Sequence, residues 1–185
     1  FLIKYSEIGL KGNNKYMFEN SLIRHIKKAL EHLGDFNVSK TQGRIYVECP
    51  DVYDYQEAVK ALKNVFGIAW ICPVKILESI DFEEIKESVG DFIDKRYQDK
   101  NFTFKVEAKR QDKGYPLKSP EICAKVGAYV LNLFPEMSVD VHNPDVRIMV
   151  EVRDNTYIYS ENIKGLGGMP VGSNGKAMLL LSGGI

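Results

Sequence analysis

The sequence lacks several features that would assign it to a well-defined class of protein. It has three cysteines (Cys49, Cys72 and Cys123) and no Cys-x-x-Cys pair, which gives no sign of a disulfide framework or a zinc site. No apolar run approaches the roughly 20 residues that cross a membrane. Lys4 interrupts the apolar N-terminus, so no signal peptide is indicated. We therefore expect a cytoplasmic protein without membrane association.

The chain also lacks net charge, because 25 basic residues balance 25 acidic ones. This balance argues against a uniformly basic nucleic-acid binder but not against local patches. The charges are in fact segregated. Residues 77–99 hold eight acids and three bases, whereas residues 100–128 hold seven bases and three acids, and residues 1–30 hold six bases and two acids.

Residues 1–75 are predicted to form an N-terminal ferredoxin-like domain. Apolar residues recur at helical spacing from Phe18 to Leu33 and from Ala58 to Phe66. Strands are predicted on either side of these helices, at residues 1–5, 36–40, 44–48 and 68–74. The order strand, helix, strand, strand, helix, strand is the split β-α-β pattern of ferredoxin-like folds.

Residues 76–162 are predicted to form a second, small α/β domain, so that the overall fold class is α+β. One helix begins after Asp81 as a capping residue, and another covers 119–134, with Ser119 as N-cap and Pro120 at its first position. The strands are expected at 102–108, 138–142, 146–152 and 156–161.

The end of the sequence changes character. Residues 163–177 hold five of the fifteen glycines and are interpreted as a Gly-rich linker. Residues 178–185, "MLLLSGGI", combine an apolar strand with a Gly-rich turn of the kind that holds phosphates. A strand of this length does not fold alone, so we expect these residues to be the truncated start of a third domain.

A basic loop is the strongest candidate for a binding site. Lys109, Arg110, Lys113 and Lys118 surround Tyr115 between a predicted strand and a predicted helix. Cations beside a ring and a helix N-terminus can pair phosphates and stack a base. The alternative is a solvated loop whose cations balance the acidic helix before it. No hydrolytic or other catalytic constellation precedes residue 178.

Three stretches resemble one protein family. "IKYSEIGLKGNNKYMFENSL" is similar to the opening of bacterial tRNA 4-thiouridine synthetases, also called tRNA sulfurtransferases. Residues 102–162 resemble a THUMP domain, whose usual extent would be about 57–162 here. "MPVGSNGKAMLLLSGGI" resembles the entry to the family's PP-loop ATP pyrophosphatase domain, in which Ser-Gly-Gly-x-Asp-Ser forms the ATP loop.

The resemblance implies a reaction for the full enzyme. With ATP and Mg²⁺ it would adenylate the C4 oxygen of uridine 8 in tRNA. A persulfide derived from a cysteine desulfurase would then displace AMP and leave 4-thiouridine. The family also transfers sulfur for thiamine biosynthesis, and a homodimer is plausible for it. The first two domains would bind tRNA, with the THUMP domain at the acceptor stem and the 3′ end.

The resemblance also assigns residues. The start of the ATP site would comprise Leu180, Leu181, Ser182, Gly183 and Gly184, and the RNA contacts would comprise Lys109, Arg110, Lys118, Lys11 and Lys164. The Asp and Ser of the ATP loop would follow Ile185, so we expect this chain alone to bind RNA, not to hold ATP stably and not to thiolate. The alternatives are a noncatalytic THUMP RNA-binding module and a THUMP-containing tRNA methyltransferase.

Overall fold

The computed structural model describes residues 1–41, 44–173, 175 and 178, which form two compact units. The first unit comprises Phe1–Cys72 together with the chain from Asn162 onward, and the second comprises Pro73–Glu161. The second unit is therefore an insertion in the sequence of the first.

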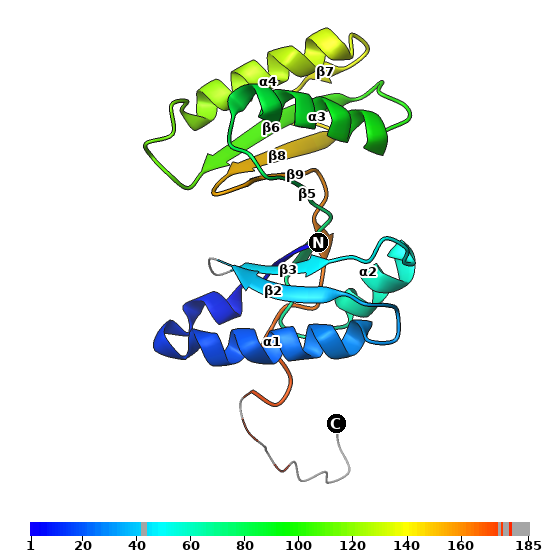
Figure 1. Ribbon diagram of the computed structural model, residues 1–185, viewed down its shortest axis with the longest axis vertical. Coiled ribbons are helices and arrows are strands. Elements are labelled where there is room, and N and C mark those ends of the chain that lie inside the picture. Colours follow the sequence, from blue (N-terminus) through cyan, green and yellow to red (C-terminus); the bar gives the residue numbers. More distant parts are fainter. Residues whose placement is uncertain (42–43, 174, 176–177, 179–185) are drawn as a thin grey trace. The chain divides into compact units, whose positions relative to one another are not determined.

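The first unit has the predicted ferredoxin-like order, which the model confirms (Figure 1). Its elements are β1 (Leu2–Lys4), η1 (Glu7–Leu10), η2 (Gly12–Asn14), α1 (Lys15–Leu30), β2 (Asn37–Thr41), β3 (Arg44–Glu48), α2 (Tyr55–Lys63), β4 (Trp70–Cys72) and β10 (Ile163–Lys164). The strands form an antiparallel sheet in the order β10-β4-β1-β3-β2.

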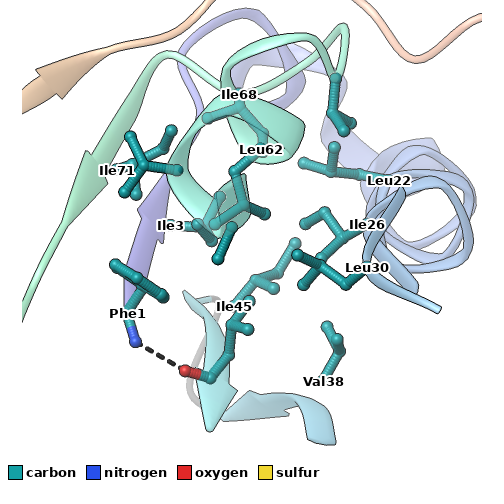
Figure 2. Packing of buried hydrophobic residues seen from close by; sticks show 14 of the residues in the cluster. Phe1, Ile3, Leu22, Ile26, Leu30, Val38, Ile45, Leu62, Ile68 and Ile71 are labelled. Carbon is teal, nitrogen blue, oxygen red and sulfur yellow. Dashed lines mark hydrogen bonds between the residues drawn. The ribbon is translucent and has the colours of Figure 1, made fainter. Parts of the chain in front are cut away.

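The core of the first unit forms where the apolar stripe of α1 meets the sheet. Leu22, Ile26 and Leu30 recur every four residues, so they share one helix face, and all are buried. Figure 2 shows them directed toward Ile3 and Ile45 of the sheet. The same figure shows the backbone nitrogen of Phe1 donating a hydrogen bond to the carbonyl of Val47 (2.6 Å), which extends the pairing of β1 with β3 by one residue.

The second unit is a mixed sheet with α3 and α4 on one face (Figure 1). Its elements are β5 (Lys75–Leu77), α3 (Phe82–Arg96), β6 (Thr103–Arg110), α4 (Ser119–Leu133), β7 (Ser138–Val139), β8 (Val146–Val152) and β9 (Thr156–Tyr159). The strand order is β5-β9-β8-β6-β7, with β6 parallel to both of its neighbours. Asp81 caps α3 as predicted, because its carboxylate accepts hydrogen bonds from the amides of Glu83 and Glu84.

The boundary between the units differs from the predicted one at residue 75. The strand that we expected over 68–74 ends at Cys72, and Lys75–Leu77 form β5, which pairs with β9 of the second sheet. The chain re-enters the first unit at Asn162. The side chain of this residue accepts hydrogen bonds from the Lys4 ammonium (3.0 Å) and the Cys72 thiol (3.2 Å), both in the first unit.

The first half of the predicted linker at 163–177 is not a linker but part of the first unit. Ile163–Lys164 form β10, which pairs with β4. The amide of Gly165 then donates to Ala69 (3.0 Å), and Gly167 exchanges backbone hydrogen bonds with Ile68 and Gly67. Met169 packs against the core of the first unit. Residues 163–170 are therefore a bound strap of the first unit. Gly165 permits its close approach to Ile68, and Gly167 and Gly168 adopt positive φ values of 68° and 70° that favour glycine.

No helix in the described part of the chain is both long and apolar enough to cross a membrane.

A substitution in the strap tests its packing. A Cβ added at Gly165 would lie 2.4 Å from the carbonyl oxygen of Ile68, so Gly165→Ala forces the strap away from the first unit. We expect a loss of about 1–3 kcal/mol in the free energy of unfolding, the usual scale of overpacking. Urea denaturation measures it.

Gly127→Ala is the matched control. Gly127 lies within α4, and a Cβ there would meet nothing within 4 Å. Replacing a helical glycine by alanine in open space stabilises by about 0.5–1 kcal/mol. Equal midpoints for Gly165→Ala and the unaltered chain would contradict the close packing of the strap.

Candidate RNA-binding surfaces

A polar pocket of about 330 Å³ lies in the second unit at the carboxyl ends of the parallel strands β6 and β8. It is lined by Ala108, Lys109, Arg110, Gln111, Ser119, Glu151, Val152 and Arg153. The first residue of α4, Ser119, brings the positive end of the helix dipole to the same place. Both features favour an anion in the pocket.

The parallel pairing of β6 with β8 brings cations from different parts of the sequence together. Lys109 is exposed and lies opposite Glu151 in the register. Arg153 follows β8 and donates a hydrogen bond to the side chain of Gln111 (2.9 Å). The Glu151 carboxylate is 2 % exposed, lies 3.6 Å from Nε of Arg153 and accepts a hydrogen bond from Tyr159 (2.6 Å). Glu151 therefore pairs with Arg153 and offsets part of the positive charge of the pocket, which leaves Lys109 and Arg110 as its remaining cations.

Arg153 was not among the predicted RNA contacts. Its sequence neighbourhood gives little signal, because it sits in a turn between two strands with an acid on either side. Only the strand register places it beside Lys109 and Arg110.

Arg110 has a structural role in addition to its charge. Its Nη1 donates to the carbonyl oxygens of Lys113 (2.6 Å) and Tyr115 (3.3 Å), which closes the basic loop onto the end of β6. Tyr115 packs against the core, and its hydroxyl donates to the carbonyl of Ile80 (2.8 Å). The ring that we expected to stack a base is therefore a half-buried anchor of the loop.

The start of α4 lies one residue earlier than predicted. Lys118, not Ser119, is the N-cap, and Pro120 occupies the second helical position. The backbone amide of Lys118 donates to the carboxylate of Glu121 (2.7 Å), as in a capping box. This bond fixes the backbone, while Lys118 remains exposed and directly precedes Ser119 of the pocket lining.

A larger hollow of about 760 Å³ lies between α4 and β6. Its lining is mostly apolar, with Lys105 and Lys109 as its only cations among the described residues. This lining does not match a phosphate, so the smaller polar pocket is the better candidate for an RNA contact.

The first unit has a cationic surface of its own. Lys11 is exposed before α1, and the exposed face of α1 carries Arg24, Lys27 and Lys28. The helix contains one acid, Glu19, and this side chain is 2 % exposed. Burial together with the charges of Arg24 and Lys28 lowers the pKa of His25, as expected on a surface of positive potential.

The buried Glu19 holds the segment that leads to Lys11. Its carboxylate accepts hydrogen bonds from the Tyr5 hydroxyl and the Lys40 ammonium, and Lys15 lies 3.6 Å away. Burial alone would raise the pKa of Glu19, but the bonds from Lys40 and Tyr5 outweigh it, and the pKa lies below its ordinary value of 4.5. The ionised carboxylate therefore fastens α1 to β1 and β2.

The remaining predicted residues fall in two places. Lys164 is exposed on β10 and belongs to the first unit, as does Lys11, whereas Lys109, Arg110 and Lys118 belong to the second. The predicted ATP-site residues Leu180, Leu181, Ser182, Gly183 and Gly184 lie outside the described residues.

Comparisons with known proteins agree with the division into two units. Residues 1–72 match the model of the ThiI ferredoxin-like domain, and residues 79–161 match the THUMP domain. A probable tRNA sulfurtransferase of Lachnoclostridium phytofermentans is 61 % identical over all 185 residues. The chain spans 47 % of that relative, about half of its length.

Solved structures show the same similarity. A 4-thiouridine synthetase, crystallised as an RNA complex with bound ATP, is 38 % identical and superposes with a TM-score of 0.80 over 99 % of this chain and 46 % of that one. The protein PH1313 from Pyrococcus horikoshii is 35 % identical, with a TM-score of 0.78 over 94 % of this chain and 57 % of that one.

The pKa of Glu19 gives a testable dependence of stability on pH. Because the folded-state pKa is lowered, the ionised carboxylate stabilises the fold above the ordinary pKa, and this stabilisation is lost as the pH falls below about 4.5. Glu19→Gln should cost about 2 kcal/mol at pH 7, the scale of hydrogen bonds to a charged group. Below pH 4.5 the difference from the unaltered chain should shrink.

Urea denaturation across this pH range measures the effect, with Glu57→Gln as control. Glu57 pairs with Lys60 at 3.2 Å on an exposed surface, where such pairs contribute about 0–1 kcal/mol. A difference between Glu19→Gln and the unaltered chain that does not vary with pH would contradict the proposed network.

Proposed function

Because the chain joins a ThiI-type ferredoxin-like domain to a THUMP domain, we propose that it is the tRNA-binding part of a tRNA sulfurtransferase. The observation that carries the proposal is the polar pocket of the THUMP domain. There, Lys109, Arg110 and Arg153 gather at the strand ends beside the N-terminus of α4.

These groups suit the RNA backbone for physical reasons. Guanidinium groups present parallel donors to phosphate oxygens, and the free amides at a helix N-terminus supply further donors. Arg110 and the capping box at Lys118 hold the loop in shape before RNA arrives, which reduces the entropy lost on binding. The cationic surface around Lys11 and α1 offers additional phosphate contacts in the ferredoxin-like domain.

The proposed reaction of the whole protein is thiolation of uridine 8. ATP, with Mg²⁺, would activate the C4 oxygen as an adenylate, since a carbonyl oxygen is otherwise a poor leaving group. The terminal sulfur of a persulfide, supplied by a cysteine desulfurase, would attack C4 and release AMP. A thiol would then cleave the disulfide that this attack forms, which leaves 4-thiouridine and a new disulfide. The acceptor stem and 3′ end of tRNA would lie on the THUMP domain. Sulfur transfer for thiamine biosynthesis, a homodimeric assembly and a cytoplasmic location belong to the same proposal.

Alanine at two exposed cations tests the THUMP surface. We expect Lys109→Ala/Lys118→Ala to weaken tRNA binding at low salt, because two phosphate contacts are lost. The slope of log K against log salt should flatten by about 0.9 for each contact on a duplex, or about 0.7 on a single strand. Fluorescence anisotropy of labelled tRNA at several salt concentrations measures both quantities.

Lys95→Ala is the matched control for this experiment. Lys95 is equally exposed but lies on α3, which carries five acids, where phosphate would be repelled. Affinity and slope should stay as they are in the unaltered chain. If the double variant also keeps both, the pocket is not an RNA contact.

The reaction has its own test. The protein expressed from the full coding sequence, given tRNA, ATP, Mg²⁺ and a persulfide donor, should produce 4-thiouridine at position 8. Nucleoside mass spectrometry of the digested tRNA detects this product. Absence of 4-thiouridine would refute the proposed reaction. Formation of a methylated nucleoside in the presence of a methyl donor and without ATP would support the methyltransferase alternative instead.

A further inference from the structure

A row of three side chains crosses the first unit where β1, β4 and β10 pair. Lys4 of β1 and Lys164 of β10 are both register partners of Trp70 on β4. The residues before them in β1 and β10, Ile3 and Ile163, and the residue after Trp70, Ile71, all belong to the core. Successive side chains alternate across a strand, so Lys4, Trp70 and Lys164 point to the face opposite α1 and α2. Trp70 and Lys164 are exposed there, although Leu2 and Cys72 of the same face are buried.

Trp70 is an exposed aromatic residue within the sheet of the first unit. It is 40 % exposed and is the chain's single tryptophan. Lys164 is exposed beside it, and the Lys4 ammonium is held nearby by a hydrogen bond to Asn162 (3.0 Å). Register partners in an antiparallel pair have Cα atoms about 5 Å apart, so the indole stands between two cations at close range.

We propose that this row, Lys4-Trp70-Lys164, binds an unpaired nucleotide of RNA, with the base stacked on the indole of Trp70. The inference rests on the proposed function, because it extends the RNA surface from the THUMP domain to the ferredoxin-like domain. A sheet that presents an exposed aromatic side chain is a recurrent platform for single-stranded RNA. Lys164 contacts the adjoining phosphate, and Asn162 keeps Lys4 on the other side of the ring.

Charge and geometry favour a nucleotide over an apolar peptide. An apolar partner would have to desolvate two ammonium groups without a counter-charge, whereas a nucleotide offers a π-face and a phosphate together. The strap is necessary for this arrangement, because without β10 the row would lose Lys164 and β4 would become an open edge. Gly165 therefore contributes to the site indirectly, by allowing the strap to lie against Ile68 and Ala69.

The single tryptophan makes the proposal directly measurable. Tryptophan emission, excited at a wavelength where the ten tyrosines absorb little, reports on Trp70 alone. Titration with a mixed-sequence single-stranded RNA, and with tRNA, should quench the emission, whereas the same RNA as a blunt duplex should quench it little. Binding is followed independently by anisotropy of labelled RNA.

Two variants separate stacking from charge. Trp70→Leu should weaken single-stranded RNA binding about tenfold with an unchanged salt slope, because stacking releases no counterions. Lys164→Ala should flatten the slope by about 0.7 and retain the quenching. Lys109→Ala/Lys118→Ala serves as the matched control, since it alters affinity but should leave the quenching at saturation unchanged.

The results distinguish failure of the nucleotide-binding row from failure of the proposed function. Binding of tRNA without any change in emission would overturn the row as a base platform and leave the proposed function intact. Absence of tRNA binding by anisotropy would overturn both. If Trp70→Leu does not fold, as judged by urea denaturation, the quenching of the unaltered chain and the slope of Lys164→Ala still decide the question.

Discussion

The backbone pairing of β10 with β4 is the contact on which the organisation of the chain depends. It adds only two residue pairs, Ile163 with Ile71 and Lys164 with Trp70, yet these pairs close the ferredoxin-like sheet after an insertion of nearly half the chain. The amides of Gly165 and Gly167 extend the contact, and Met169 anchors it in the core. Because hydrogen bonds in a sheet are mutually aligned, the pairing also fixes which side chains stand beside Trp70.

The surfaces of the two units use charge in different ways. In the THUMP domain, the cations around the pocket are held by carbonyl oxygens and by the buried Glu151, so their directions are set before a ligand binds. In the ferredoxin-like domain, the only acid of α1 is buried, so the charged side chains on the exposed face of that helix are all cations. A chain without net charge thus presents local positive surfaces, because Glu19 and Glu151 are buried and a further five acids are concentrated on α3.

Much of the fold could be predicted from the sequence, and the failures have a common cause. Periodicity located the four long helices, and β3 and β8 have the expected bounds, because both signals are local. The elements that were missed, β5 and β10, are three and two residues long and exist only through pairing with a distant strand. Residues that reach the site through pairing of distant strands could likewise not be predicted from local sequence. Lys109 was visible as a charge, whereas Arg153 and Trp70 became relevant only through strand register.

The hydrogen bond between Cys72 and Asn162 has a consequence for how such a chain can be built. It places the two ends of the inserted domain side by side on neighbouring antiparallel strands. A two-residue turn of the kind found in β-hairpins would suffice to join these strands if the insertion were absent. The second unit therefore takes the place of the loop between β4 and β10. A domain whose two ends lie close together can be inserted at such a position at little entropic cost. The pairing of β4 with β10 alone is thus what allows a second domain to be inserted into the first.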